Sequence, residues 1–126
     1  EGMTLPKNIG GYLDLRSLMN IDGLVLPETI GEYLYLENLT SVEGLVLPKS
    51  VGERLYLDCL ISVKNLVLPE TIGGNLCLRN LTNAEDLIIP DPLTYNIKMH
   101  GFTITPENVH MFRNNNIQEQ ESKSVK

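Results

Sequence analysis

The segment LPETIGEYLYLENL, residues 26–39, contains the most informative pattern in the sequence. Its central YLYL alternates leucine with tyrosine, which is the two-residue period of a strand with one buried face. The stretch has three close copies: LPKNIGGYLDLRSL begins at Leu5, LPKSVGERLYLDCL at Leu47 and LPETIGGNLCLRNL at Leu68. The period is 21 residues without an insertion. Such a fixed period is typical of a repeat protein.

A fifth, more divergent copy, IPDPLTYNIKMHGF, continues the register from Ile89. Apolar residues occupy nearly the same slots in each copy. In the second copy these slots hold Ile30, Leu34, Leu36, Leu39, Val42, Leu45 and Leu47. A single coil buries too little to offset the entropy lost when its backbone is ordered, so the coils must stack on one another. We therefore expect a mainly β fold, a parallel β-solenoid of about five 21-residue coils.

Each coil is expected to hold two strands. The first is YLDL, YLYL, RLYL, NLCL or NIKM, and the glycines before it fit a turn with unusual backbone angles. The second is LVLP, in which Leu24 and Leu26 face inward around Val25 and Pro27 ends the ladder. The remaining connections are too short for a helix of ten or more residues.

The two ends of the chain differ from its middle. We expect residues 1–104 to form the solenoid, and Thr105 and Pro106 to begin a capping helix over 105–117. The tail, 118–126, has little to bury and is expected to be disordered. At the other end the chain opens inside a coil, so we expect a C-terminal piece of a longer array with an uncapped N-terminal edge.

The I-G-G-x-L-x-L core of IGGYLDL and IGGNLCL, the L-T-S or L-T-N that follows and the recurrent LP resemble a known family. They are similar to bacterial leucine-rich repeats of the short, roughly twenty-residue class, which occur in effector-like and phage-associated proteins. The resemblance covers residues 1 to about 104 and implies a leucine-rich-repeat solenoid. The family's asparagine position holds leucine or phenylalanine here, and Asn38 and Asn80 lie one position early. A regular asparagine ladder is therefore not expected.

Side chains between the strand leucines should face solvent and form columns about 4.8 Å apart from coil to coil. One column is Tyr12, Tyr33, Arg54, Asn75 and Asn96; the next is Asp14, Tyr35, Tyr56, Cys77 and Lys98; the third is Arg16, Glu37, Asp58, Arg79 and His100. Tyrosine and arginine are enriched at binding hot spots. We expect a partner protein to contact Tyr12, Asp14, Tyr33, Tyr35, Glu37, Arg54, Tyr56, Asp58, Asn75 and Arg79. The alternative is that neighbouring tyrosines only stabilise the sheet.

A second outward column is apolar. It holds Val25, Val46, Val67 and Ile88, with Thr4 ahead of them. Such a column is either a second contact surface or a β-branched ladder that stabilises exposed strands without a partner, and the latter interpretation is favoured.

Charge and cysteine content exclude several partners and environments. The net charge is −6, with sixteen acidic residues against ten basic ones, which argues against nucleic acid. No apolar run approaches the roughly 18 residues of a membrane span, so no membrane is expected. Cys59 and Cys77 form no CxxC pair, and free thiols favour a reducing, cytosol-like environment. This would be the bacterial cytoplasm, or a host cytosol for a secreted effector.

No arrangement typical of catalysis is present, so we expect no enzyme, no cofactor and no metal. Glu37 and Asp58 are close enough in register for acid/base work or a cation, but the arginines beside them favour an ion-pair ladder. Cys77 has no histidine in register to activate it. The glycine pairs precede strands rather than helices, so they do not form a phosphate loop.

The sequence thus predicts a non-enzymatic protein-protein interaction module that binds its partner through the exposed sheet. The alternative is a structural spacer or self-assembly element of a larger multidomain protein, associating through the N-terminal edge or the apolar column. Carbohydrate binding through the tyrosines and Asn75 is a third, weaker hypothesis.

Overall fold

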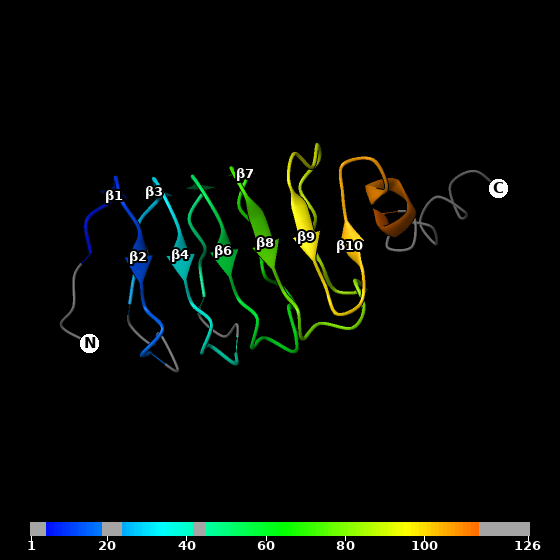
Figure 1. Ribbon diagram of the computed structural model, residues 1–126, viewed down its shortest axis with the longest axis horizontal. Helices are drawn as coiled ribbons and strands as arrows, with labels where there is room; N and C mark the ends of the chain where they lie inside the picture. The colour runs from blue at the N-terminus through cyan, green and yellow to red at the C-terminus, as the bar shows by residue number, and fades with distance from the viewer. Residues whose placement is uncertain (1–4, 19–23, 42–44, 114–126) are drawn as a thin grey trace.

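The computed structural model describes residues 5–18, 24–41 and 45–113, and it shows a β-solenoid of about four turns (Figure 1). The expected fold class is confirmed. Thr4 and Val42, residues 114–117 of the expected cap and the expected tail, 118–126, lie outside the described part of the chain.

A six-stranded sheet runs along the solenoid in the order β10-β9-β8-β6-β4-β2. Its strands are β2 (Leu13–Asp14), β4 (Leu34–Tyr35), β6 (Leu55–Tyr56), β8 (Asn75–Cys77), β9 (Asn96–Lys98) and β10 (Thr103–Ile104). All neighbours pair in parallel except β9 and β10. Leu34 pairs with Leu55 and Leu55 with Leu76, so the register equals the 21-residue sequence period.

A four-stranded parallel sheet lies next to the glycines, in the order β1-β3-β5-β7. Its strands are β1 (Asn8–Ile9), β3 (Thr29–Ile30), β5 (Ser50–Val51) and β7 (Thr71–Ile72). The sequence predicted this second ladder at LVLP, and that prediction was wrong. The described parts of those segments form one isolated parallel bridge, Val67 with Ile88. Each segment ends in a proline, which has no N–H to donate, and the continuous ladder forms only after it.

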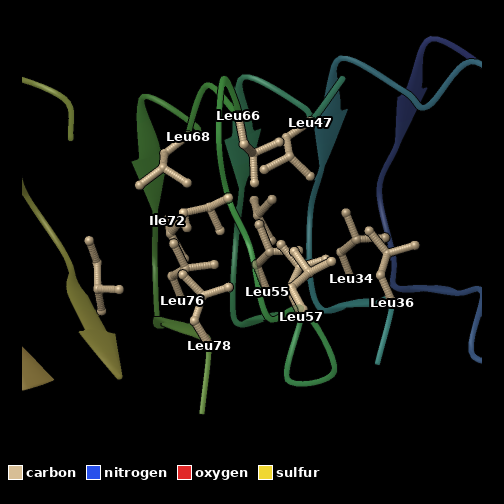
Figure 2. Packing of buried hydrophobic residues seen from close by; sticks show 14 of the residues in the cluster. Leu34, Leu36, Leu47, Leu55, Leu57, Leu66, Leu68, Ile72, Leu76 and Leu78 are labelled. Carbon is tan, nitrogen blue, oxygen red and sulfur yellow. The ribbon is translucent and has the colours of Figure 1, made fainter. Parts of the chain in front are cut away.

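The LVLP segments still show the expected alternation. We call residues 24–27, 45–48, 66–69 and 87–90 the return segments. Leu45 and Leu47 are buried on either side of the exposed Val46, and the same pattern holds around Val67. Figure 2 shows Leu47, Leu66 and Leu68 of the return segments directed toward the strand leucines Leu34, Leu55 and Leu76. The core therefore fills the space between the six-stranded sheet and the return segments.

The glycines after β3, β5 and β7 have a different role from the predicted one. Among the described glycines only Gly101 has a positive φ, 87°, so unusual backbone angles do not explain Gly31, Gly52 and Gly73. A Cβ added at any of these three would lie closer than 3.0 Å to the carbonyl oxygen of the glycine one coil earlier. Glycine is required there because successive backbones approach too closely for a side chain.

The fifth copy ends the four-stranded sheet instead of continuing it. Pro92 stands where the earlier coils have Asn8, Thr29, Ser50 and Thr71, and it has no N–H for the ladder. Gly10, Gly31, Gly52 and Gly73 form what we call the glycine column, and Thr94 stands at its next position. The backbones of successive coils approach too closely in this column to leave room for a side chain. The six-stranded sheet does continue through β9, and the chain then reverses at Gly101 into the antiparallel β10, which the sequence analysis did not predict.

Helical turns at 109–113 follow β10 at the end of the solenoid (Figure 1). Thr105 and Asn108 cap them reciprocally: the Asn108 N–H donates to Thr105 Oγ1 at 3.1 Å, and the Thr105 N–H donates to Asn108 Oδ1 at 2.7 Å. Phe112 stacks on Phe102 with ring centroids 5.5 Å apart. Arg113 donates to the carbonyl oxygens of Ile89 and Pro90. A small helix near the C-terminus is therefore present, but it begins at Val109 rather than at the predicted Pro106, because residues 105–108 form the turn that caps it.

Candidate binding face on the six-stranded sheet

The ten residues predicted to bind a partner belong to the strands of the six-stranded sheet or lie within two residues of them. Tyr12, Asp14, Arg54 and Arg79 are exposed, whereas the other six are half-buried: Tyr33, Tyr35, Glu37, Tyr56, Asp58 and Asn75. The buried leucines alternate with them, as the strand period requires. We call this outer surface, with its four tyrosines, the tyrosine face.

The tyrosine rings stack on one another across three coils. Tyr35 and Tyr56 are nearly parallel, with centroids 5.3 Å apart and an interplanar angle of 3°. Tyr33 stacks on Tyr35 at 5.7 Å, and Tyr12 meets the edge of Tyr35 at 6.3 Å. Parallel strands in register place the same residue type at neighbouring rungs, which brings the rings into contact. The face is thus a preordered aromatic surface.

Two arginines border the aromatic surface. The Arg16 guanidinium lies 4.9 Å from the centroid of the Tyr35 ring and forms a 2.5 Å ion pair with Asp14. This pairing lowers the pKa of the Asp14 carboxyl and raises the pKa of Arg16. Arg54 donates to the Tyr56 hydroxyl at 3.4 Å, which raises the pKa of Arg54. Partial burial against its neighbours raises the pKa of the Tyr35 hydroxyl.

Arg16 was not among the predicted binding residues. Its place in the same outward column as Glu37, two residues after Asp14, was visible in the sequence. Its position over a ring one coil away depends on the side-chain rotamer, which no spacing rule provides.

The predicted ion-pair ladder is present at one step. Arg79 pairs with Asp58 of the preceding coil at 3.3 Å, and its backbone N–H donates to the same carboxylate at 3.0 Å. Arg16 instead pairs with Asp14 in its own coil. Glu37 occupies the position of the column between Arg16 and Asp58, and its Oε1 is buried without a hydrogen-bond partner among the residues that the structure describes. The carboxylates are therefore tied mainly to arginines, and among the described residues no group of three or more His, Cys, Asp or Glu is placed to hold a metal ion.

Asn38 contacts the neighbouring coil at the edge of the face. The Asn38 amide donates to the carbonyl oxygen of Arg16 in the preceding coil. Asn80, in the equivalent position, lies at an exposed turn. No helix in the described ranges is long and apolar enough to cross a bilayer.

Cys77 departs from the accessible position that the column pattern predicted. Its side chain is fully buried, although the strand alternation directs it away from the core. Longer side chains surround it: Tyr56 and Lys98 are its partners on the adjoining strands, and Arg54 and Arg79 belong to the neighbouring columns. Burial raises the pKa of this thiol. Cys59, at a turn, is only half-buried.

The two thiols should therefore differ in reactivity. We expect iodoacetamide at pH 8 to alkylate Cys59 at least about tenfold faster than Cys77, because the thiolate is the reactive form and Cys77 is both covered and harder to ionise. Mass spectrometry of tryptic peptides over a time course measures both rates. In denaturant the two rates should converge, and equal rates in the folded protein would contradict the burial of Cys77.

No family model, curated protein or solved structure matches this chain. The interpretation of the face therefore depends on its own geometry.

Proposed function

We propose that this chain is a non-enzymatic interaction module that binds a partner protein through the tyrosine face. The observation that carries the proposal is the stack of Tyr33, Tyr35 and Tyr56. Each ring offers a flat apolar surface with a polar hydroxyl at its tip, a combination that favours protein interfaces. The mutual stacking fixes the rings before binding, so little side-chain entropy remains to be lost when a partner docks.

The charges around the rings favour a partner of mixed polarity. Arg16 and Arg54 lie against the rings, and Asp14 and Asp58 lie in the neighbouring positions, so the face has no strong excess of either sign. A strongly basic or acidic ligand would meet like charges as well as opposite ones. A protein surface with apolar or aromatic side chains and a few polar groups fits this face better.

We further propose a relationship to the short bacterial leucine-rich repeats of effector-like or phage-associated proteins. The support is the 21-residue spacing, the inward leucines and the IGG-L-L core. In that case the chain would act in a reducing compartment, the bacterial cytoplasm or a host cytosol, which fits its two free cysteines.

The binding face is tested with the double variant Tyr35→Ser/Tyr56→Ser. We expect it to reduce capture of specific partners from lysate at least about tenfold, since tyrosines that become buried in an interface are frequent hot spots. Quantitative mass spectrometry of the captured proteins measures the change. The matched control is Ile61→Ser/Met111→Ser, which removes two exposed apolar residues outside the face and should capture the wild-type set.

Folding of both variants is checked by thermal melting, because stacked tyrosines also stabilise strands. If a folded Tyr35→Ser/Tyr56→Ser variant captures the same proteins in the same amounts as the wild type, the tyrosine face is not the binding surface.

A further inference from the structure

The return segments leave an apolar column exposed. We call Val25, Val46, Val67 and Ile88 the valine column; their side chains are 78%, 77%, 67% and 47% exposed. The column does not belong to the six-stranded sheet, and only Val67 and Ile88 are joined by a bridge. A contiguous exposed column of this kind is typical of a contact surface rather than of scattered surface hydrophobics.

Grooves separate the successive ridges of the valine column. One, with a volume of about 520 Å³, lies between the first two return segments and is lined by Val25, Pro27 and Val46. A second, of about 360 Å³, lies between the next two and is lined by Val46, Val67 and Pro69. Each groove is bordered by one carboxylate and one ammonium group, Glu28 with Lys49 and Lys49 with Glu70.

These border residues belong to a charged row that alternates from coil to coil. The row is Lys7, Glu28, Lys49 and Glu70, each directly after a proline at the same position of the repeat. The charge in this row therefore repeats every two coils, whereas the apolar residues of the core repeat in every coil. Within the chain, Lys7 and Glu28 approach to 3.9 Å, while Lys49 and Glu70 form no ion pair among the described residues. Exposed pairs of this kind contribute little to stability, so internal pairing is a weak explanation of the alternation.

The alternation is self-complementary under two-fold symmetry. We propose that a second copy of this chain docks on the valine column, with the two-fold axis crossing the coils between Val25 and Val46. The axis reverses the order of coils in the partner, so Glu28 faces the second copy's lysine at 49, and Lys7 faces its glutamate at 70. All four contacts join opposite charges, as an isologous interface requires. Ile88 and Asp91 lie beyond the overlap, so the apolar contact on the axis is made by Val25 and Val46.

Spacing favours a second copy over an unrelated partner. The charges of the row are one coil apart, the rise set by strand pairing, and an identical stack of coils presents charges with the same rise. The groove of about 520 Å³ lies on the proposed axis, where Val25 and Val46 of the two copies meet. This dimer uses a different surface from the tyrosine face and does not depend on the proposed function.

Charge exchange tests the arrangement. Sedimentation equilibrium over a range of concentrations should give a monomer–dimer equilibrium for the wild type. The single variant Lys49→Glu places two like-charge contacts at the interface and should raise the dissociation constant about tenfold or more. The double variant Glu28→Lys/Lys49→Glu should return it to within about threefold of the wild type, because every facing pair is again opposite.

The double variant also separates the dimer from internal pairing. Within one chain the double variant places a lysine at 28 beside Lys7, which are like charges. If Lys49→Glu acted by disturbing pairs inside the monomer, the double variant would therefore not restore the wild-type behaviour. The Tyr35→Ser/Tyr56→Ser variant is the control and should dimerise as the wild type does. A wild-type monomer at all concentrations, a dimer that Lys49→Glu does not weaken, or a failure of the double variant to restore it would each overturn the proposal.

Discussion

Gly52→Ala should destabilise the solenoid by about 3 kcal/mol or more, which is a large part of the 5–15 kcal/mol typical of a domain. The added Cβ would overlap the backbone carbonyl of Gly31 in the preceding coil. A backbone atom cannot rotate away as a flexible side chain can, and the Gly52 N–H already donates to the Ile30 carbonyl at 2.7 Å. The coils would have to separate at this point. Urea denaturation followed by circular dichroism measures the loss.

Gly10→Ala is the matched control for this prediction. Gly10 occupies the same column, but a Cβ added there meets nothing within 4 Å. Its φ is not positive, so alanine fits the backbone without strain. Alanine should therefore leave the stability unchanged or raise it by up to about 1 kcal/mol, because it lowers the conformational entropy of the unfolded chain. If Gly52→Ala and Gly10→Ala have equal effects, close packing of the coils is not the reason for the glycine column.

Leu55→Ala should cost about 3–5 kcal/mol of the free energy of unfolding. Leu55 is 0% exposed and lies in the middle of the column formed by Leu13, Leu34, Leu76 and Ile97. The coils above and below are fixed by backbone pairing on both sides, so the cavity left by the smaller side chain has little freedom to collapse. The same denaturation experiment measures the change.

The comparison variant for Leu55→Ala is Leu13→Ala, in the same column but in the first coil of the repeat array. Leu13 is only half-buried and has one strand neighbour, β4, so its truncation should cost less than half as much. Ile61→Ala, at a position 74% exposed, should change stability by less than about 0.5 kcal/mol. Equal losses at Leu13 and Leu55 would contradict a stack in which inner coils are covered on both faces.

The sequence period was enough to predict the five parallel strands of the six-stranded sheet and their register, because the leucine alternation leaves one face buried and a shift by one residue would expose it. The register of Leu34, Leu55 and Leu76 confirms this. The second sheet was missed because LVLP has the stronger apolar alternation, whereas Thr29–Ile30 and its equivalents are only two residues long. Backbone pairing of such short strands depends on how the coils stack, which local pattern does not encode.

The glycine column shows the same limit. Glycine before a strand is compatible with either a special φ or a close backbone approach, and only the stacked coils distinguish the two. The β9–β10 hairpin was also missed, because the fifth copy was interpreted by its repeat register rather than by the turn at Gly101.

At the tyrosine face, alternation predicted which side chains point outward but not how they touch. The stacking of Tyr35 on Tyr56 and the position of Arg16 follow from rotamers and from strand spacing together. Cys77 was predicted as accessible for the same reason: the pattern gives its direction, and the longer side chains around it decide its exposure.

Nuclear Overhauser contacts in solution would show whether successive 21-residue coils stack in parallel register. We expect backbone contacts that join positions 21 residues apart, from Leu13 to Leu34, Leu55, Leu76 and Ile97 in turn. Backbone contacts at a different sequence separation, or the sequential pattern of helices across these strands, would contradict it.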